Sequence, residues 1–238
     1  MNKTNQLICA HSALFFAVAM GIGWFFVPGW FPPIDPGMDA NAVQTMYEEN
    51  RMRIRFGMTL AAFSSVFWWT LSAAIAMQMK RIEGNYPVLA WAQMAAASGT
   101  VLVILFAAYF NLAASYRPGT PAETTQIFTD LAWLMMIGAW PPGVIQNVLI
   151  GLCILSDKNE KKVYPRWLGY ANFWIAILYL PGSMLPFFYG GPFSWHGIFG
   201  FWLVANFFFL WIMLMWWYTV KAIKHQAQSQ IDHSGLAS

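Results

Sequence analysis

The chain has 238 residues, of which 58% are hydrophobic, 18% aromatic and 10% charged, and its formal net charge is +3. Soluble domains carry about 25% charged residues and about half apolar ones at most. The composition therefore excludes a soluble globular domain, a disordered or collagen-like chain and a nucleic-acid-binding protein. It indicates an integral membrane protein whose main partner is the lipid bilayer.

Six apolar segments are long enough to cross a membrane. A bilayer core of about 30 Å requires about 20 mostly apolar residues in helical form. Long runs without alternation are typical of helices and not of barrel strands. We therefore predict an all-α bundle of six transmembrane helices, which are Leu7–Val27, Phe56–Met77, Val88–Ala114, Leu131–Leu155, Leu168–Tyr189 and Ile198–Tyr218.

The first apolar segment has two interpretations. Lys3, the apolar run and the small residues at 17–21 also suit a cleaved signal peptide. However, the apolar run continues through Trp24 to Val27, which is longer than a signal peptide requires. The length favours an uncleaved helix.

The connection between the first two spans changes character at Asp39. Residues 28–39 contain four prolines and cannot be helical throughout. Asp39 suits a helix N-cap, and the following residues 40–55 contain neither Gly nor Pro. A helix over residues 40–79 would be about 60 Å long, twice the bilayer core. We expect it either to project from the outer side of the membrane or to bend at Gly57 and lie on the surface.

The fourth and fifth spans contain helix breakers. Trp140-Pro141-Pro142 lies near the middle of the fourth, and Pro181-Gly182 with Pro186 interrupts the fifth. Amides such as Asn147 commonly stabilise helix packing. Beside interrupted helices they can also line a binding pocket, so Asn147 is a candidate ligand-binding residue.

The loop charges predict the orientation. One side holds nine Lys and Arg residues and the other holds four. The positive-inside rule places the richer side in the cytoplasm, together with both termini. We expect one transmembrane domain, residues 1–224, and a polar, disordered cytoplasmic tail, residues 225–238. The expected location is a bacterial inner membrane.

The outer end of the second helix carries the densest polar group. Glu48, Arg51 and Arg55 are spaced by three and four residues, which places them on one helical stripe. They form either a solvated, ion-paired helix end, an anion-binding site or a contact with a partner protein.

Three further outer residues are candidates for chemistry. Asp130 is an ionisable group near the membrane boundary, which suggests function, although it could also stabilise the N-terminus of the fourth helix. Arg117 lies on the same side. His196, beside Trp195 at the start of the sixth helix, could be an acid/base, a metal ligand or a hydrogen-bonded interface residue.

Familiar catalytic and cofactor motifs are missing from the sequence. There is no HxxxH, HExxH or Cys/His cluster, so neither a metal nor another cofactor is expected. We predict that Asp130, Arg117, the arginines and Trp195-His196 meet near the outer face. The first hypothesis is a protein that binds or helps to move a hydrophobic or amphipathic small molecule, or a subunit of a membrane complex. The second is a membrane enzyme for a lipid-like or isoprenoid substrate, with Asp130 or Glu48 as general acid and His196 in support.

Overall fold

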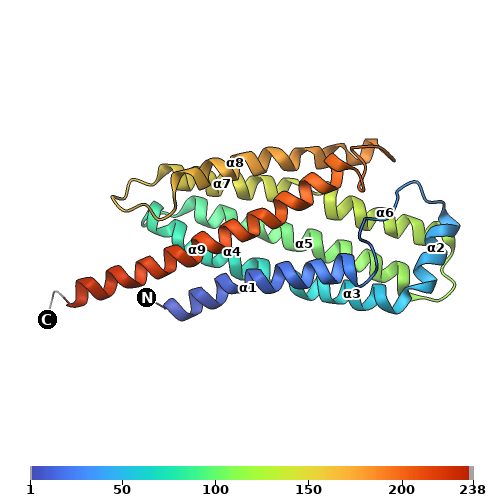
Figure 1. The fold of residues 1–238 in the computed structure, drawn as a ribbon, viewed down its shortest axis with the longest axis horizontal. Helices are drawn as coiled ribbons and strands as arrows, with labels where there is room; N and C mark the ends of the chain where they lie inside the picture. Colours follow the sequence, from blue (N-terminus) through green and yellow to red (C-terminus); the bar gives the residue numbers. More distant parts are fainter. Residues whose placement is uncertain (1, 236–238) are drawn as a thin grey trace.

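The protein is a lengthwise bundle of apolar helices. The computed structural model describes residues 2–235, and side chains within residues 2–228. Six helical stretches in this part of the chain are long and apolar enough to span a membrane, which confirms the predicted number. Figure 1 shows α1 beginning and α9 ending at the same end of the bundle. The stretches are Lys3–Phe26, Arg51–Glu83, Val88–Tyr116, Ala122–Ser156, Arg166–Phe187 and Ile198–Gln228.

Most of these stretches are built from more than one helical segment. Short π-helical or 3₁₀ segments, labelled η, continue three of the α-helices. In chain order the elements are α1 (Lys3–Gly21), η1 (Ile22–Phe26), α2 (Ala40–Glu49), α3 (Arg51–Ser65), α4 (Phe67–Glu83), α5 (Val88–Tyr116), α6 (Ala122–Gly138), α7 (Pro141–Ser156), α8 (Arg166–Tyr179), η2 (Leu180–Phe187), η3 (Ile198–Leu203) and α9 (Val204–Gly235).

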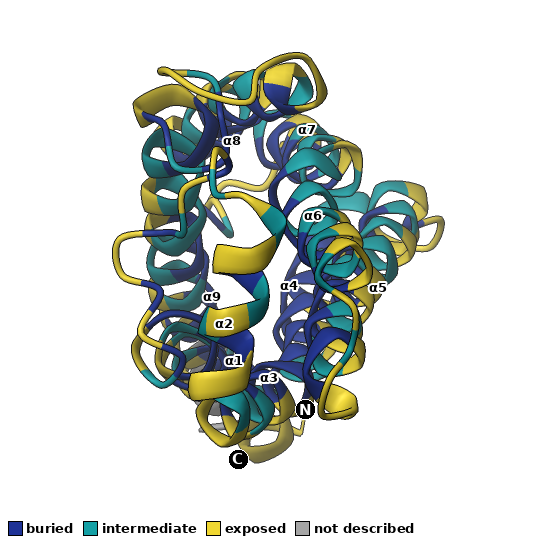
Figure 2. Cartoon of the chain, turned by 90° about the vertical axis from the view of Figure 1, so that its right-hand side faces the viewer, coloured by how far each residue is buried: buried dark blue, intermediate teal, exposed yellow. Residues whose placement is uncertain are grey.

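The helix that precedes the second span bends at Asn50. Asp39 caps α2 as predicted, because its carboxylate accepts a hydrogen bond of 2.9 Å from the Ala42 amide. Asn50 then leaves helical geometry (φ −107°, ψ 15°), and its side-chain amide donates to the Met46 carbonyl. The expected bend at Gly57 is wrong, since α3 runs straight through that residue. Figure 2 shows α2 lying across the end of the bundle.

Glycines allow several helices to pack closely. A Cβ on Gly23 would lie 2.6 Å from the carbonyl oxygen of Gly57, so η1 and α3 meet backbone to backbone. A Cβ on Gly151 would lie 3.0 Å from the carbonyl oxygen of Gly169, where α7 crosses α8. Such small-residue contacts are typical of helix packing in membranes, where burial of apolar surface adds little.

The predicted interruptions of the fourth and fifth spans are present and lie against each other. α6 ends at Gly138 and α7 begins at Pro141, whose ring removes a backbone donor. The fifth span changes from α8 to the 3₁₀ segment η2 at Leu180. A Cβ on Gly182 in η2 would lie 2.9 Å from the carbonyl oxygen of Ile137, so the two interruptions are in direct contact.

A network of buried polar side chains joins α4, α5 and α7. The Gln146 side-chain oxygen accepts from Trp68 Nε1 at 3.1 Å. Its amide nitrogen donates to Ser72 Oγ and to Gln93 Oε1, each at 3.1 Å. Every polar atom of the Gln146 side chain therefore has a partner, and the network stabilises the packing of the three helices.

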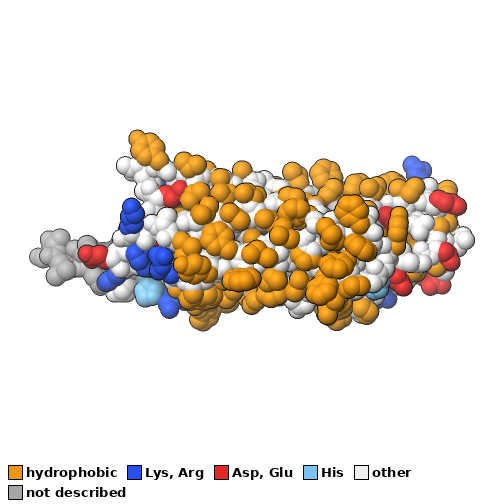
Figure 3. Space-filling model, turned by 90° about the horizontal axis from the view of Figure 1, so that it is seen from above, with side chains coloured by type: hydrophobic (Ala, Val, Ile, Leu, Met, Phe, Trp, Pro, Cys, Tyr) orange, Lys and Arg blue, Asp and Glu red, His pale blue; other side chains and the backbone are white. Residues whose placement is uncertain are grey.

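The charges of the bundle lie at its two ends. On the face shown in Figure 3, most Lys and Arg side chains lie at the end that holds the termini, most Asp and Glu at the other, and a hydrophobic belt lies between them. The helix α9 continues to Gly235, so the backbone of the predicted tail is helical from residue 225 to that point. Residues 236–238 lie outside the described part, and the disordered tail stays a prediction.

Candidate functional site

Glu48, Arg51 and Arg117 share a small hollow at the end of the bundle away from the termini, which is called the outer end from here on, and the end with the termini is called the inner end. They line it together with Tyr47 and Ser115, and its volume is about 10 Å³. That volume corresponds to about one water molecule, so the hollow is too small for an organic anion. Burial raises the pKa of Tyr47, whose hydroxyl donates to Asn111 Oδ1 at 2.7 Å, so this phenol stays neutral.

Arg55 lies beside the hollow, but its guanidinium donates hydrogen bonds to backbone carbonyls. Its Nε donates to the Ser115 carbonyl at 3.0 Å, and its Nη2 donates to the carbonyls of Ser115 and Tyr116. These carbonyls belong to the last turn of α5, where a helix lacks internal partners and favours a positive charge. Arg55 therefore caps α5 in this structure.

Asp130 lies in a different outer cavity. The cavity has a volume of about 120 Å³ and is lined by Asp130, Trp195, Leu185, Tyr189 and three other residues. The carboxylate makes no hydrogen bond or ion pair with any residue that the structure describes. α6 begins at Ala122, so Asp130 lies two turns inside the helix. The alternative role of Asp130 as an early-turn carboxylate is therefore wrong.

Three further candidate residues, His196, Trp195 and Asn147, each make a polar contact within the protein. His196 Nδ1 lies 3.1 Å from Ser194 Oγ, and Trp195 Nε1 donates to the Ile34 carbonyl at 3.1 Å. Asn147 donates to the Gly143 carbonyl at 2.8 Å within α7, and its buried Oδ1 has no hydrogen-bond partner among the described residues.

The predicted outer cluster thus forms two groups. One comprises Glu48, Arg51 and Arg117 around the small hollow, and the other comprises Asp130 and Trp195 around the larger cavity. Asn147 lies on the inner half of the fourth span. Within the described part of the chain, no cluster of His, Cys, Asp and Glu side chains is arranged to hold a metal ion.

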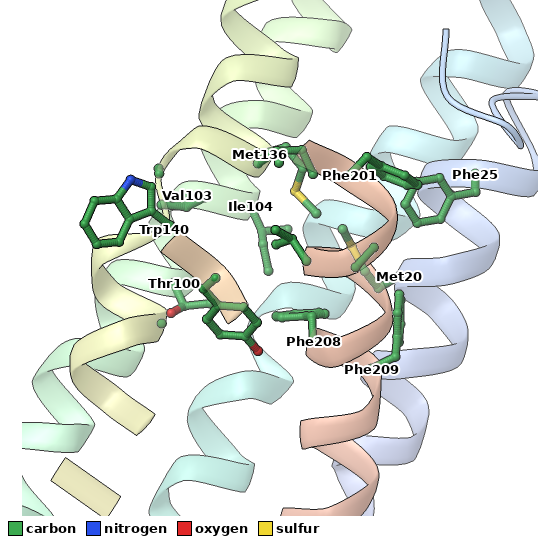
Figure 4. A pocket seen from close by; sticks show the side chains of 16 residues that line it. Met20, Phe25, Thr100, Val103, Ile104, Met136, Trp140, Phe201, Phe208 and Phe209 are labelled. Carbon is green, nitrogen blue, oxygen red and sulfur yellow. The ribbon is translucent and has the colours of Figure 1, made fainter. Parts of the chain in front are cut away.

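An apolar cavity that the sequence did not indicate lies at the interruption of the fourth span. It has a volume of about 80 Å³, several times the room of one water. It lies between α9 on one side and α5 with the α6–α7 junction on the other. Figure 4 shows its lining side chains, which include Met20, Phe25, Thr100, Val103, Ile104, Met136, Trp140, Phe201, Phe208 and Phe209.

Two hydroxyls on the cavity wall have no hydrogen-bond partner among the described residues. Thr100 is 9% exposed, and its Oγ1 is buried and unpaired. Tyr179 is 5% exposed and lines the same cavity, in contact with Gly143. A buried hydroxyl without a partner costs free energy, so Thr100 Oγ1 favours an occupant with a polar atom, and the Tyr179 hydroxyl can contact the same atom.

Aromatic side chains close the cavity toward the outer end. Phe201 lines the cavity, and its ring lies 6.4 Å from that of Trp133. Trp133 lies 5.8 Å from both Trp24 and Trp30, and all three indoles are at most 1% exposed. Their Nε1 donors have no hydrogen-bond partner among the described residues. These residues form an aromatic layer between the cavity and α2.

A second aromatic group closes the cavity toward the inner end. Phe208 lines the cavity and stacks on Trp68, with ring centres 5.2 Å apart and an angle of 1° between the planes. Trp68 also stacks on Trp211 at 5.1 Å. Trp211 Nε1 donates to Asn172 Oδ1 at 2.8 Å, which anchors the stack to α8.

Comparison with protein-family models, with curated protein sequences and with solved structures gives no match to this chain. The fold itself defines the class, which is a multi-pass helical membrane protein. At the α6–α7 junction, this fold combines an apolar cavity wall with a buried, unpaired hydroxyl, that of Thr100.

Proposed function

We propose that the protein binds a hydrophobic or amphipathic small molecule in the cavity at the α6–α7 junction. The observation that carries this proposal is a buried, unpaired hydroxyl, that of Thr100, on an apolar, aromatic cavity wall that also includes Tyr179. Small-molecule sites are commonly apolar clefts with a few placed polar groups. Interrupted membrane helices are also typical places for such sites.

The wall chemistry restricts the occupant. No acidic or basic side chain lines the cavity, so a charged group there would lack a counter-ion. Two hydroxyls can each donate one hydrogen bond and accept others. The best fit is an uncharged molecule, largely ring or hydrocarbon, with one carbonyl or hydroxyl near Thr100 and Tyr179.

The charge distribution supports an orientation with the termini in the cytoplasm. Nine of the thirteen Lys and Arg residues lie at the end of the bundle that holds the termini, in helix ends or in the loop between α7 and α8. The positive-inside rule assigns that end to the cytoplasm, and we place the protein in a bacterial inner membrane on this basis. The cavity then lies in the half of the membrane away from the cytoplasm.

Native mass spectrometry tests the proposal. The full chain is purified in mild detergent without delipidation, and the bound mass and the absorption spectrum are recorded on one sample. We expect a small molecule in wild type and about tenfold lower occupancy in Ala205→Phe, because Ala205 lines the cavity and a phenyl ring fills it. The matched control is Ala113→Phe on the exposed face of α5, which should retain the occupant.

Two results would contradict the proposal. Wild-type protein without any bound molecule would remove its basis, and so would equal occupancy in wild type and Ala205→Phe. If the sample instead carries a second polypeptide in fixed ratio, the protein is a subunit of a membrane complex.

A second candidate function is a membrane enzyme for a lipid-like or isoprenoid substrate. The unpaired carboxylate of Asp130 beside Trp195 in its own cavity favours this candidate. Lipid mass spectrometry of membranes from cells that produce wild type, Asp130→Asn or no protein tests it. If Asp130 is a general acid, the Asp130→Asn membranes should match those without protein, whereas a binder should leave them like wild type.

A further inference from the structure

A basic groove lies at the end of the bundle that holds the termini. The loop between α7 and α8 contributes Lys162, Val163 and Pro165, and α9 contributes Tyr218, Lys221, Ala222 and His225. The groove has a volume of about 300 Å³. An adjoining groove of about 400 Å³ on the same helix includes Trp217, Lys221 and Lys224.

The grooves lie at the depth where phospholipid head groups are found. Trp217 is 58% and Trp167 is 47% exposed, and the Trp167 ring meets Tyr218 edge to face at 5.3 Å. Exposed tryptophans and tyrosines of this kind mark a membrane–water interface. Figure 3 shows Lys and Arg side chains gathered where the hydrophobic belt ends at this side of the molecule.

The lining of the grooves is basic among the residues that the structure describes. Neither groove is lined by an acidic side chain in the described part of the chain. Asp157 lies in the same loop, but its carboxylate accepts from the backbone of Asn159 and Val163 and is 4% exposed. Lys162 donates one hydrogen bond, of 2.9 Å, to the Asp157 carbonyl, which leaves two of its three N–H donors.

Lys221 and Lys224 have no hydrogen bond or ion pair with the described residues, and both are exposed. They are three residues apart on α9, so their side chains emerge from adjacent turns of one face. Beside them, Trp217 and Val220 give the second groove an apolar wall. A cationic end joined to an apolar wall is complementary to a phosphate with acyl chains attached.

We propose that these grooves bind the head-group phosphate of an anionic phospholipid in the adjacent leaflet. Lys162 and Lys221 would contact the phosphate from two elements, and Lys224 would add charge at its edge. The acyl chains would follow the apolar wall of α9. Basic pockets at the cytoplasmic membrane surface bind such head groups in this way. The inference is independent of the proposed function, because the grooves and the cavity share no lining residue.

Lipid titration by native mass spectrometry tests the inference. The delipidated full chain is titrated with phosphatidylglycerol and, separately, with phosphatidylcholine of identical acyl chains. We expect wild type to bind phosphatidylglycerol about tenfold more tightly. The double variant Lys221→Gln/Lys224→Gln should lose most of this preference, while the control Lys3→Gln/Lys80→Gln, with two exposed lysines removed at the same end, should keep it.

A second readout separates binding from misfolding. Phosphatidylglycerol should raise the melting temperature of wild type and of the control, but not that of the Lys221→Gln/Lys224→Gln variant. Glycerol 3-phosphate should not compete, since it lacks acyl chains. The inference is overturned if both lipids bind wild type equally, if the double variant keeps the full preference, or if glycerol 3-phosphate displaces the lipid.

Discussion

Gly23 of η1 and Gly57 of α3 are in backbone contact, and neither position has room for a side chain. A Cβ on Gly23 would lie 2.6 Å from the Gly57 carbonyl oxygen and 2.9 Å from the Ala61 nitrogen. The contact fixes the first span against the second at the outer half of the bundle. It also explains why α3 does not bend at Gly57, because a bend would separate the two backbones.

Gly23→Ala should destabilise the protein by about 1–3 kcal/mol, because the added methyl group forces the helices apart. The measurement is the free energy of unfolding in detergent. Gly21→Ala is the control, since nothing lies within 4 Å of a Cβ there and alanine favours a helix over glycine. Equal destabilisation by the two substitutions would show that the contact does not matter.

Arg55 and Arg51 should differ although they lie one turn apart. Arg55→Ala removes the cap on the α5 carbonyls of Ser115 and Tyr116 and should cost about 1–2 kcal/mol. Arg51→Ala removes a side chain that only borders a small hollow and should be nearly neutral. Thermal unfolding of both variants decides the matter. A larger effect at Arg51 would contradict the assigned roles.

Gln146→Leu should be strongly destabilising, although neither side chain carries a charge. It leaves Trp68 Nε1 and the Gln93 side-chain oxygen buried without their partner, at about 1–3 kcal/mol for each unpaired group. Asn206→Leu is the control, because that exposed amide bonds only within its own span, at the Trp202 carbonyl of η3. Unfolding in a denaturing detergent compares them. A similar midpoint for both variants would show that the network contributes nothing.

The aromatic layer predicts a difference between two tryptophans of similar burial. Trp133→Phe removes an indole N–H without a described partner, whereas Trp211→Phe also leaves Asn172 Oδ1 unpaired. We therefore expect Trp211→Phe to cost about 1 kcal/mol more than Trp133→Phe. Chemical denaturation monitored by circular dichroism measures both. If Trp133→Phe is the costlier change, its N–H has an acceptor such as a bound water.

The unfolding free energy should fall in alkali because Tyr164 loses its proton more readily in the unfolded chain than in the folded protein. Tyr164 lies in the loop between α7 and α8, and its hydroxyl is 3.0 Å from Thr219 Oγ1. Burial raises the pKa of this phenol. The unfolded chain releases the phenolic proton near pH 10 while the folded chain keeps it, so the unfolding free energy falls as the pH rises above about 10. Tyr164→Phe should weaken this fall. The test is the melting temperature between pH 8 and pH 11; identical slopes would count against it.

The features that could be predicted from the sequence are those controlled by composition and by helix-breaking residues. The six spans, the Asp39 cap and the interruptions at Pro141 and Pro181 all follow from local chemistry, and the structure confirms them. The bend at Asn50 did not follow, because glycine is the more flexible residue in isolation. Only the packing partner of Gly57 shows that this glycine serves close contact.

The cavity could not be predicted for a related reason. Thr100 and Tyr179 lie in apolar spans that also contain other polar residues, such as Gln93 in α5 and Asn172 in α8, and nothing in their own segments distinguishes them. They meet only because α5 and α8 both adjoin the α6–α7 junction. Trp30 likewise suits the membrane interface by sequence, yet it is 1% exposed within the aromatic layer. Long-range packing, which leaves no local pattern, decides all three positions.

The aromatic groups at both ends of the cavity also determine which concentration of a small molecule would set its occupancy of the cavity. Trp133 with its neighbours lies between the cavity and the outer end of the bundle, and the stack on Trp68 lies between the cavity and the inner end. A molecule that reaches the cavity by passing between helices exchanges with the hydrocarbon phase. Its occupancy then follows its mole fraction in lipid or detergent. Doubling the detergent at a fixed amount of such a molecule would halve that mole fraction, so apparent affinities per litre of solution would change while the site itself does not.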